Sequence, residues 1–159
     1  MGQNGATVWD RFYPRFLGGR AAIGLLAVRV VAGTAFMWHG SGKIQQPFSW
    51  MPSEAPVPGI LQALAAVSEF GGGLAWIVGL LTPLASLGIL VTMSVACLFH
   101  ISRGDPFVNG SGGGAYELAL VYWTVALLLL TVGPGRLSLD ALWLQPRRAN
   151  VTEAAAAVQ

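Results

Sequence analysis

Residues 59–100, GILQALAAVSEFGGGLAWIVGLLTPLASLGILVTMSVACLFH, contain two long apolar blocks joined by a very short connection. The first block runs from about Gly59 to Leu81, and the second runs from Leu84 to His100. Each block is close to the roughly 20 residues that a helix needs to cross a bilayer. The connection at residues 81–83 is so short that the two helices must be antiparallel neighbours. This stretch therefore predicts a helical hairpin inside a membrane.

Two further apolar blocks flank the hairpin, at Ala21–Trp38 and Ala115–Val132. Of the 159 residues, 54% are apolar and only 10% are charged, against roughly 25% charged residues in an ordinary soluble domain. A water-soluble bundle is disfavoured, because so few charges cannot form polar outer faces on its helices. We therefore expect an all-α fold, a four-transmembrane-helix antiparallel bundle over residues 21–144. An interfacial segment (1–20) precedes it, and a flexible tail (145–159) follows it.

The charge balance and the cysteine content exclude several classes of function. Nine Lys and Arg residues against seven Asp and Glu residues give a net charge of +2, and the basic residues form no run. Nucleic-acid binding therefore has no support. A single cysteine excludes an internal disulfide, a CxxC redox pair and a cysteine-rich metal site.

The distribution of basic residues predicts the orientation in the membrane. Six of the nine lie before the first block or after the last one: Arg11, Arg15, Arg20, Arg136, Arg147 and Arg148. Cytoplasmic flanks carry the excess of Lys and Arg. We therefore expect both termini in the cytoplasm. The connections at about 40–58 and 103–114 then lie on the exported side.

The segments next to the membrane carry aromatic and leucine side chains at helical spacing. Before the first block these are Trp9, Phe12, Tyr13 and Phe16, and after the fourth block they are Leu139, Leu142 and Trp143. Both sets suit short interfacial helices, although Pro14 favours an irregular tail for the first set. No signal peptide of the usual form precedes the first block. Arg136 and Asp140 are four residues apart and are expected to pair.

Two charged residues lie well inside the predicted spans, away from their ends. A central Arg costs about 2.5 to 3.5 kcal/mol on the insertion scale, so Arg29 needs a partner. Glu69, near the middle of the second block, is the candidate. Gly71, Ala75 and Gly79 form a row of small residues that allows close helix approach. An Arg29–Glu69 pair either fixes the helix register or takes part in ligand binding.

A second group of polar residues is expected at the exported mouth of the bundle. His39 and Lys43 follow the first block, His100 ends the third and Glu117 opens the fourth. Because these ends share one side of the membrane, the four side chains should lie at similar depth.

Three interpretations of this pocket remain open. It binds a small polar headgroup such as a quinone, with His and Lys donating to carbonyl oxygens and Glu or His exchanging protons. Alternatively, His39 and His100 ligate a b-type haem or a metal ion, with Cys97 as a third metal ligand. The third interpretation is an ordinary bundle end, whose polar side chains simply reach water.

The same residues also form an ordered series of motifs along the chain. The first is R-x(3)-G-x(2)-F-x(2)-H-G-x(2)-K, from Arg29 to Lys43. Glu69 with its glycines, GLLTPLA at 79–85, His100, Glu117 and GPGRLSLD at 133–140 follow. In order and spacing this series resembles the DoxX family of small bacterial membrane proteins. Pro83 stands where that family usually has a basic residue, and the segment before about Gly19 lies outside the resemblance.

The resemblance implies a four-helix bundle in the bacterial cytoplasmic (inner) membrane. Some members are small subunits of thiosulfate:quinone oxidoreductase, and others are linked to membrane-associated redox or thiol-stress assemblies. This chain carries no cofactor motif, so we expect no complete oxidoreductase and assign neither a catalytic residue nor a metal site.

The function that we expect is a quinone-facing or anchoring subunit of a membrane redox complex, in contact with lipid and with other membrane subunits. Arg29 and Glu69 would hold the base of its pocket, and His39, Lys43, His100 and Glu117 would supply polar contacts. A structural subunit of a larger assembly, with no chemistry of its own, is the alternative, and a transporter is the third.

Overall fold

The computed structural model describes residue 13 and residues 15–54 and 57–145, which form helices and no strand. The helices are α2 (Gly19–Ser41), a short 3-10 helix η1 (Lys43–Gln45), α3 (Gly59–Val78), α4 (Thr82–Ser102) and α5 (Glu117–Val132). Residues 139–145 are also helical. The expected all-α class is therefore confirmed, and each predicted block contains one long helix.

Three of the described helices, α2, α3 and α4, are long and apolar enough to cross a membrane. Helix α5 is equally apolar in character but has only 16 residues. Its length and its N-terminal bound differ slightly from the predicted block, because the chain at 115–116 is still part of the preceding loop.

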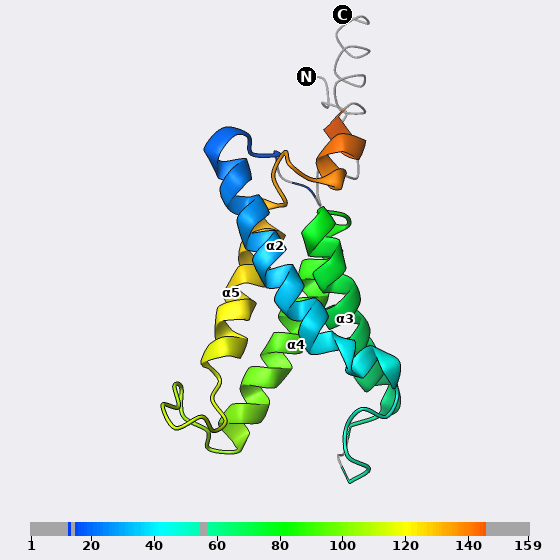
Figure 1. Ribbon diagram of the computed structural model, residues 1–159, viewed down its shortest axis with the longest axis vertical. Helices are drawn as coiled ribbons and strands as arrows, with labels where there is room; N and C mark the ends of the chain where they lie inside the picture. The colour runs from blue at the N-terminus through cyan, green and yellow to red at the C-terminus, as the bar shows by residue number, and fades with distance from the viewer. Residues whose placement is uncertain (1–12, 14, 55–56, 146–159) are drawn as a thin grey trace, which may run out of the picture.

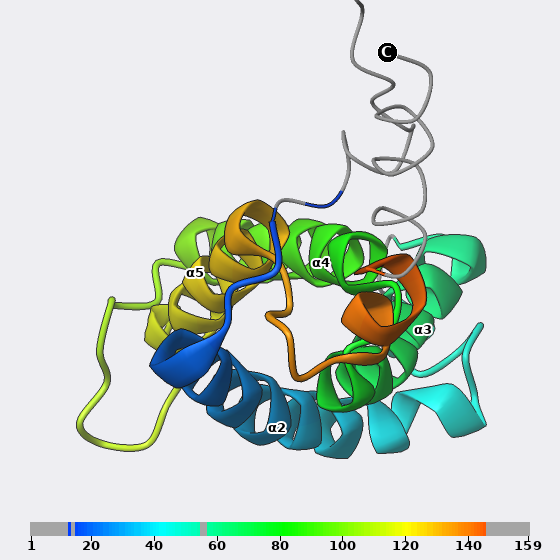
Figure 2. The ribbon, with the colours of Figure 1, turned by 90° about the horizontal axis from the view of Figure 1, so that it is seen from above.

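The helices pack in chain order (Figures 1 and 2), with α3 against α2, α4 against α3 and α5 against α4. Helices α2 and α5 contact one another much less. We call the end where α2 begins and α5 finishes the terminal end; the α3–α4 turn also lies there. The opposite end, with residues 42–54, 57–58 and 103–116, is the loop end.

The contact between α2 and α3 depends on glycine. A methyl group added at Gly33 would lie 2.6 Å from the carbonyl oxygen of Gly73, and one at Gly73 would lie 2.6 Å from that of Gly33. Further toward the loop end, a methyl group at Gly40 would lie 2.6 Å from the Phe70 nitrogen. The two backbones therefore touch directly.

The predicted row of small residues differs from this contact. A methyl group at Gly71 would meet only the Val67 side chain of its own helix, at 3.8 Å. Gly72 instead faces Ile89 of α4. The prediction that glycine allows a close approach of α2 and α3 is confirmed. The glycine at the contact is Gly73 and not Gly71, because α3 presents a different face to α2 than the one predicted.

Aromatic side chains fill the space between the helices. Trp76 and Phe36 are almost completely buried and meet edge to face, with 5.5 Å between ring centroids. Phe36 also packs on Tyr122 of α5. The Trp76 indole donates a hydrogen bond of 3.0 Å to the Ser86 hydroxyl, so its polar nitrogen is satisfied inside the bundle.

The outer surface is apolar along much of its length. On α4 one exposed row runs through Leu84, Leu87, Val91, Val95 and Leu98. Such large exposed side chains in a continuous row suit hydrocarbon and not water.

Two predictions for the segments next to the bundle need correction. Residues 15–18 are not helical, so the described part of the leader forms no interfacial helix; Trp9 and Phe12 lie outside the described residues. Asp140 does not pair with Arg136, because its carboxylate binds the α3–α4 turn and the Tyr13 hydroxyl. The predicted helix that carries Leu139, Leu142 and Trp143 is present at residues 139–145, and these three side chains are exposed.

Candidate functional site

The Arg29 side chain is buried, and its guanidinium group donates hydrogen bonds to backbone carbonyl oxygens. Its Nε donates to the Trp76 carbonyl at 2.8 Å and its Nη2 to that of Ile77 at 3.1 Å. Its Nη1 donates to the carbonyls of Pro134 (2.7 Å) and Leu137 (2.9 Å). These acceptors are the end of α3 and the chain that follows α5. Arg29 therefore joins α2 to two other segments at the terminal end.

The predicted Arg29–Glu69 pair is wrong, and the register of α2 and α3 explains why. The helices are antiparallel and touch at Gly33 and Gly73. Arg29 lies one turn from this contact toward the terminal end, whereas Glu69 lies one turn toward the loop end. At about 1.5 Å per residue the two residues are roughly 12 Å apart along the axis.

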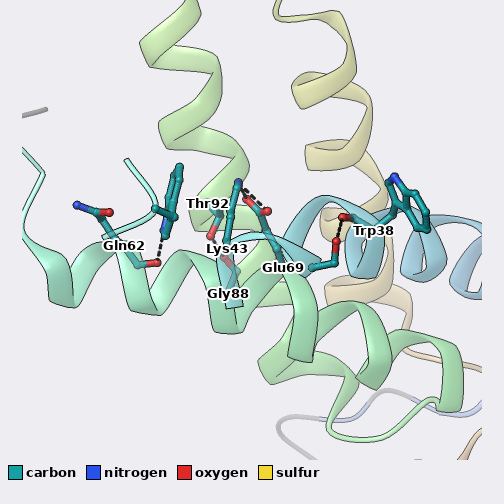
Figure 3. A network of polar contacts seen from close by, with 8 residues as sticks. Trp38, Lys43, Gln62, Glu69, Gly88 and Thr92 are labelled. Carbon is teal, nitrogen blue, oxygen red and sulfur yellow. Dashed lines mark hydrogen bonds and ion pairs between the residues drawn. The ribbon is translucent and has the colours of Figure 1, made fainter. Parts of the chain in front are cut away.

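Glu69 instead forms an ion pair with Lys43 at the loop end (Figure 3). The Lys43 Nζ lies 2.6 Å and 2.7 Å from the two carboxylate oxygens. The Glu69 side chain is only 4% exposed, while that of Lys43 is 27% exposed. Lys43 reaches Glu69 because η1 follows α2 directly and turns the chain back toward α3. A buried carboxylate thus meets a cation that remains partly accessible.

The loop after η1 folds over this ion pair. The Trp50 ring lies over Lys43, with Nζ 4.5 Å from the ring centroid. The Trp50 indole donates to the Gln62 carbonyl at 2.9 Å. The Gln62 side chain accepts from the Met51 N–H and donates to the Val57 carbonyl, both at 3.0 Å. Gln62 therefore anchors the loop, and the loop holds an aromatic ring against the ammonium group.

His39 lies on the other side of α2, close to α5. It is exposed, and its ring meets Tyr122 edge to face at 6.4 Å between centroids. Tyr122 in turn packs on Phe36, at 4.8 Å. The His39 imidazole and the Tyr122 phenol therefore lie near the loop end, between α2 and α5, two helices that make few contacts with one another.

His100 and Glu117 lie at the loop end but in different surroundings. His100 Nδ1 lies 2.7 Å from the Asp105 carboxylate, at the start of the α4–α5 loop. Glu117 is exposed at the first turn of α5, and its backbone N–H donates to the Phe107 carbonyl. Of the residues predicted from sequence, the structure brings only Lys43 and Glu69 into direct contact. Among the described residues there is no cluster of three or more His, Cys, Asp or Glu side chains that could hold a metal ion.

Asp140 joins the chain after α5 to the α3–α4 turn, a role that the sequence analysis did not predict. Its two carboxylate oxygens accept from the N–H groups of Leu81 and Thr82, at 2.8 Å and 2.9 Å, where α4 begins. Its own N–H donates to the Gly79 carbonyl. Leu81 has a positive φ of 49°, unusual for leucine. Asp140 therefore caps α4 from a distant segment and stabilises a strained turn.

Tyr13 completes this cluster, donating its hydroxyl hydrogen to Asp140 at 3.2 Å. Burial, together with the charge of Asp140, raises the pKa of the Tyr13 phenol well above its ordinary value. Asp is a favoured helix-capping residue, but no local pattern shows that Asp140 would cap a helix so distant in sequence. As Figure 2 shows, the chain after α5 crosses the terminal end toward α3.

Comparison with known proteins agrees with this architecture. Residues 24–101 match the model of the DoxX family. The chain is 34% identical over 127 residues to inner membrane protein YqjF of Escherichia coli, covering 76% of this chain and 92% of that protein. It is 32% identical over 119 residues to an uncharacterized protein of Haemophilus influenzae, covering 73% of this chain and 87% of that protein. No solved structure matches the chain.

The chain is an apolar helical protein of the bacterial cytoplasmic membrane that crosses it more than once. It belongs to the DoxX family, as the motif series predicted.

Proposed function

We propose that this DoxX-family protein is a quinone-facing accessory subunit of a membrane redox complex, and that its quinone contact is the loop-end group of Lys43, Glu69 and Trp50. The observation that carries the proposal is the Lys43–Glu69 pair, which combines a nearly buried carboxylate with a partly exposed ammonium group under an aromatic ring. Charged groups at membrane depth are costly and are typical of ligand sites and proton relays.

The chemistry of these residues suits a quinone headgroup. A quinone presents two carbonyl acceptors on a flat apolar ring. Lys43 is a hydrogen-bond donor, and Trp50 offers a flat ring for stacking. His39, on the other side of α2 against Tyr122, lies outside this group. Glu69 is a carboxylate that can take up or release the proton that accompanies quinone reduction or oxidation. His100 and Glu117, nearer the loops, would exchange protons with the exported side.

The proposal includes a membrane topology with four spans and cytoplasmic termini. Helix α5 would be about 24 Å long at 1.5 Å per residue, slightly less than the roughly 30 Å hydrocarbon core. Its ends nevertheless connect the loop end to the terminal end. The terminal end carries Arg15, Arg20 and Arg136, and this excess supports a cytoplasmic location.

Quinone binding can be tested with the full chain in lipid nanodiscs. A water-soluble short-chain quinone is titrated while tryptophan fluorescence is recorded, since quinones quench nearby indoles. We expect saturable quenching in the wild type and at least about tenfold weaker binding in Lys43→Gln and Glu69→Gln. Trp50→Phe should remove part of the quenching, because Trp50 would be the nearest indole.

Arg103→Gln is the matched control. It also removes one cation from the loop end, but Arg103 is exposed and lies over the Phe99 ring, away from Glu69. The proposal predicts unchanged quinone affinity in this variant. Equal affinities in the wild type, Lys43→Gln and Glu69→Gln would overturn it.

A structural subunit without chemistry is the alternative, and the exposed apolar row on α4 favours it, because such a face also suits a neighbouring membrane helix. In that case Glu69→Gln would reduce co-purification of partner subunits without any effect on quinone binding.

A further inference from the structure

Three exposed arginines of the described chain lie at the terminal end of the bundle and take no part in the proposed quinone site. Arg15, Arg20 and Arg136 are all exposed, and we call them the arginine cluster. None of the three forms an ion pair with an acidic side chain in the described part of the chain. This distinguishes them from Arg29, whose donors are all occupied by carbonyl oxygens.

The fold brings Arg136 beside the segment of the chain that carries Arg15 and Arg20. The Arg136 N–H donates to the Leu17 carbonyl at 2.8 Å, which ties the chain after α5 to the segment before α2. The Arg136 side chain lies against Gly18, so closely that a methyl group there would be 3.2 Å from its Cδ. Arg136 is thereby held beside the start of α2, where Arg20 lies.

No acid compensates these charges among the described residues of this end. Asp140 is the acid located there, but it is 2% exposed and its carboxylate is fully engaged by Leu81, Thr82 and Tyr13. The other described acids lie toward the loop end: Glu54, Glu69, Asp105 and Glu117. The arginine cluster therefore leaves an unbalanced positive charge at one end of the membrane helices.

Apolar side chains accompany the cluster. Leu17 and Leu137, neighbours in sequence of these arginines, are 42% and 48% exposed. A free phosphate ion gains nothing from exposed leucines. A phospholipid, in contrast, presents its phosphate at the level where its hydrocarbon chains begin to contact apolar side chains.

We propose that the arginine cluster binds the phosphate of an anionic phospholipid, such as phosphatidylglycerol, in the leaflet at the terminal end. Arginine donors match phosphate oxygens in geometry and charge. A lipid held here would contact both the segment before α2 and the chain after α5. The proposal does not depend on the quinone site, which lies at the opposite end.

Native mass spectrometry of the full chain in a neutral detergent tests this proposal. Phosphatidylglycerol and phosphatidylcholine with identical acyl chains are titrated separately. We expect the wild type to bind phosphatidylglycerol more tightly. The Arg15→Gln/Arg20→Gln/Arg136→Gln variant should lose roughly fivefold in affinity for each charge removed, with phosphatidylcholine binding unchanged.

Two further variants separate charge from folding. The triple Arg→Lys variant keeps the charges and should retain most of the preference for phosphatidylglycerol. Arg103→Gln removes a cation from the loop end and should leave that preference intact. If the triple Gln variant keeps the wild-type preference, or if Arg103→Gln weakens it equally, the cluster is not the site. Displacement of phosphatidylglycerol by an equal concentration of inorganic phosphate would identify a free-anion site and overturn the lipid assignment.

Discussion

Each buried charge in the described part of the chain is matched by a different kind of partner. Arg29 is surrounded by carbonyl oxygens, Glu69 by the ammonium group of Lys43, and Asp140 by two backbone N–H groups and a phenol. Without such partners, charges at these depths would oppose folding by several kcal/mol each. Of these three groups, only the Lys43–Glu69 pair includes a charged side chain that is partly accessible, that of Lys43. This pair is therefore the one suited to contact a ligand.

The Lys43–Glu69 pair should behave as a coupled unit. We expect Lys43→Gln and Glu69→Gln each to lower the free energy of unfolding by about 3 kcal/mol, because each leaves an unpaired buried charge or an unpaired partner. The double variant should lose less than the sum. Unfolding of the four proteins in mixed detergent measures this coupling, and strictly additive losses would show that the pair contributes no interaction energy.

Tyr13 predicts a dependence of stability on alkaline pH. Its pKa is raised in the folded protein by burial and by Asp140, relative to an ordinary value of about 10. The folded state therefore keeps a proton that the unfolded state loses. The stabilisation is complete below about pH 10 and is lost as pH rises toward the folded pKa, by at most about 1.4 kcal/mol per pH unit.

Tyr13→Phe isolates this contribution, because it keeps the ring and removes the titrating group. Thermal unfolding between about pH 8 and pH 11, followed by circular dichroism, should show a steeper loss of stability in the wild type than in this variant. Parallel curves for the two proteins would rule out the Tyr13–Asp140 contact as the cause.

At the scale of helices, the α2–α3 seam and the α3–α4 turn determine how the bundle is assembled. The seam brings two backbones into contact at Gly33 and Gly73. The turn contains Gly79 and Leu81, both with positive φ, and is held by Asp140. The seam sets the register that puts Glu69 within reach of Lys43. The turn fixes the entry of α4 into the bundle.

Two glycine substitutions in α3 should have opposite outcomes. Gly73→Ala puts a methyl group 2.6 Å from the Gly33 carbonyl oxygen and 2.8 Å from the Met37 nitrogen, so α2 must move away. We expect a loss of about 1 to 3 kcal/mol in unfolding free energy. Gly71→Ala meets only Val67 at 3.8 Å and should be neutral or stabilising by up to about 1 kcal/mol. Equal losses of unfolding free energy in the two variants, measured in detergent, would show that Gly73 has no special place at the α2–α3 contact.

Asp140→Asn should loosen the α3–α4 turn. An amide supplies one acceptor oxygen in place of two, so one of the N–H groups of Leu81 and Thr82 loses its partner, at a cost of about 1 to 3 kcal/mol. Hydrogen exchange read by mass spectrometry should accelerate around residues 79–84. Asp105→Asn is the control, since it breaks the His100 contact and should accelerate exchange only near the α4–α5 loop. Unchanged exchange at the turn in Asp140→Asn would refute its capping role.

At the scale of the molecule, periodicity and length predicted the helical class and the positions of the long helices, because a membrane helix is encoded by one continuous apolar block. The register between helices was not predictable in the same way. Glu69 was expected opposite Arg29, but the Gly33–Gly73 contact shifts them apart, and glycine rows do not reveal which face is used. The role of Asp140 depends on a chain segment that returns across the terminal end, which no local pattern encodes.

The proposed quinone contact within a membrane redox complex is the loop-end group around Lys43 and Glu69. The most direct measurement is gentle-detergent purification of the full chain from its native membrane, with quantification of bound quinone and identification of co-purifying proteins. We expect bound quinone and a redox partner with the wild type, and retention of the partner but loss of quinone with Lys43→Gln. A stable assembly that contains no quinone and no redox protein would overturn the proposal.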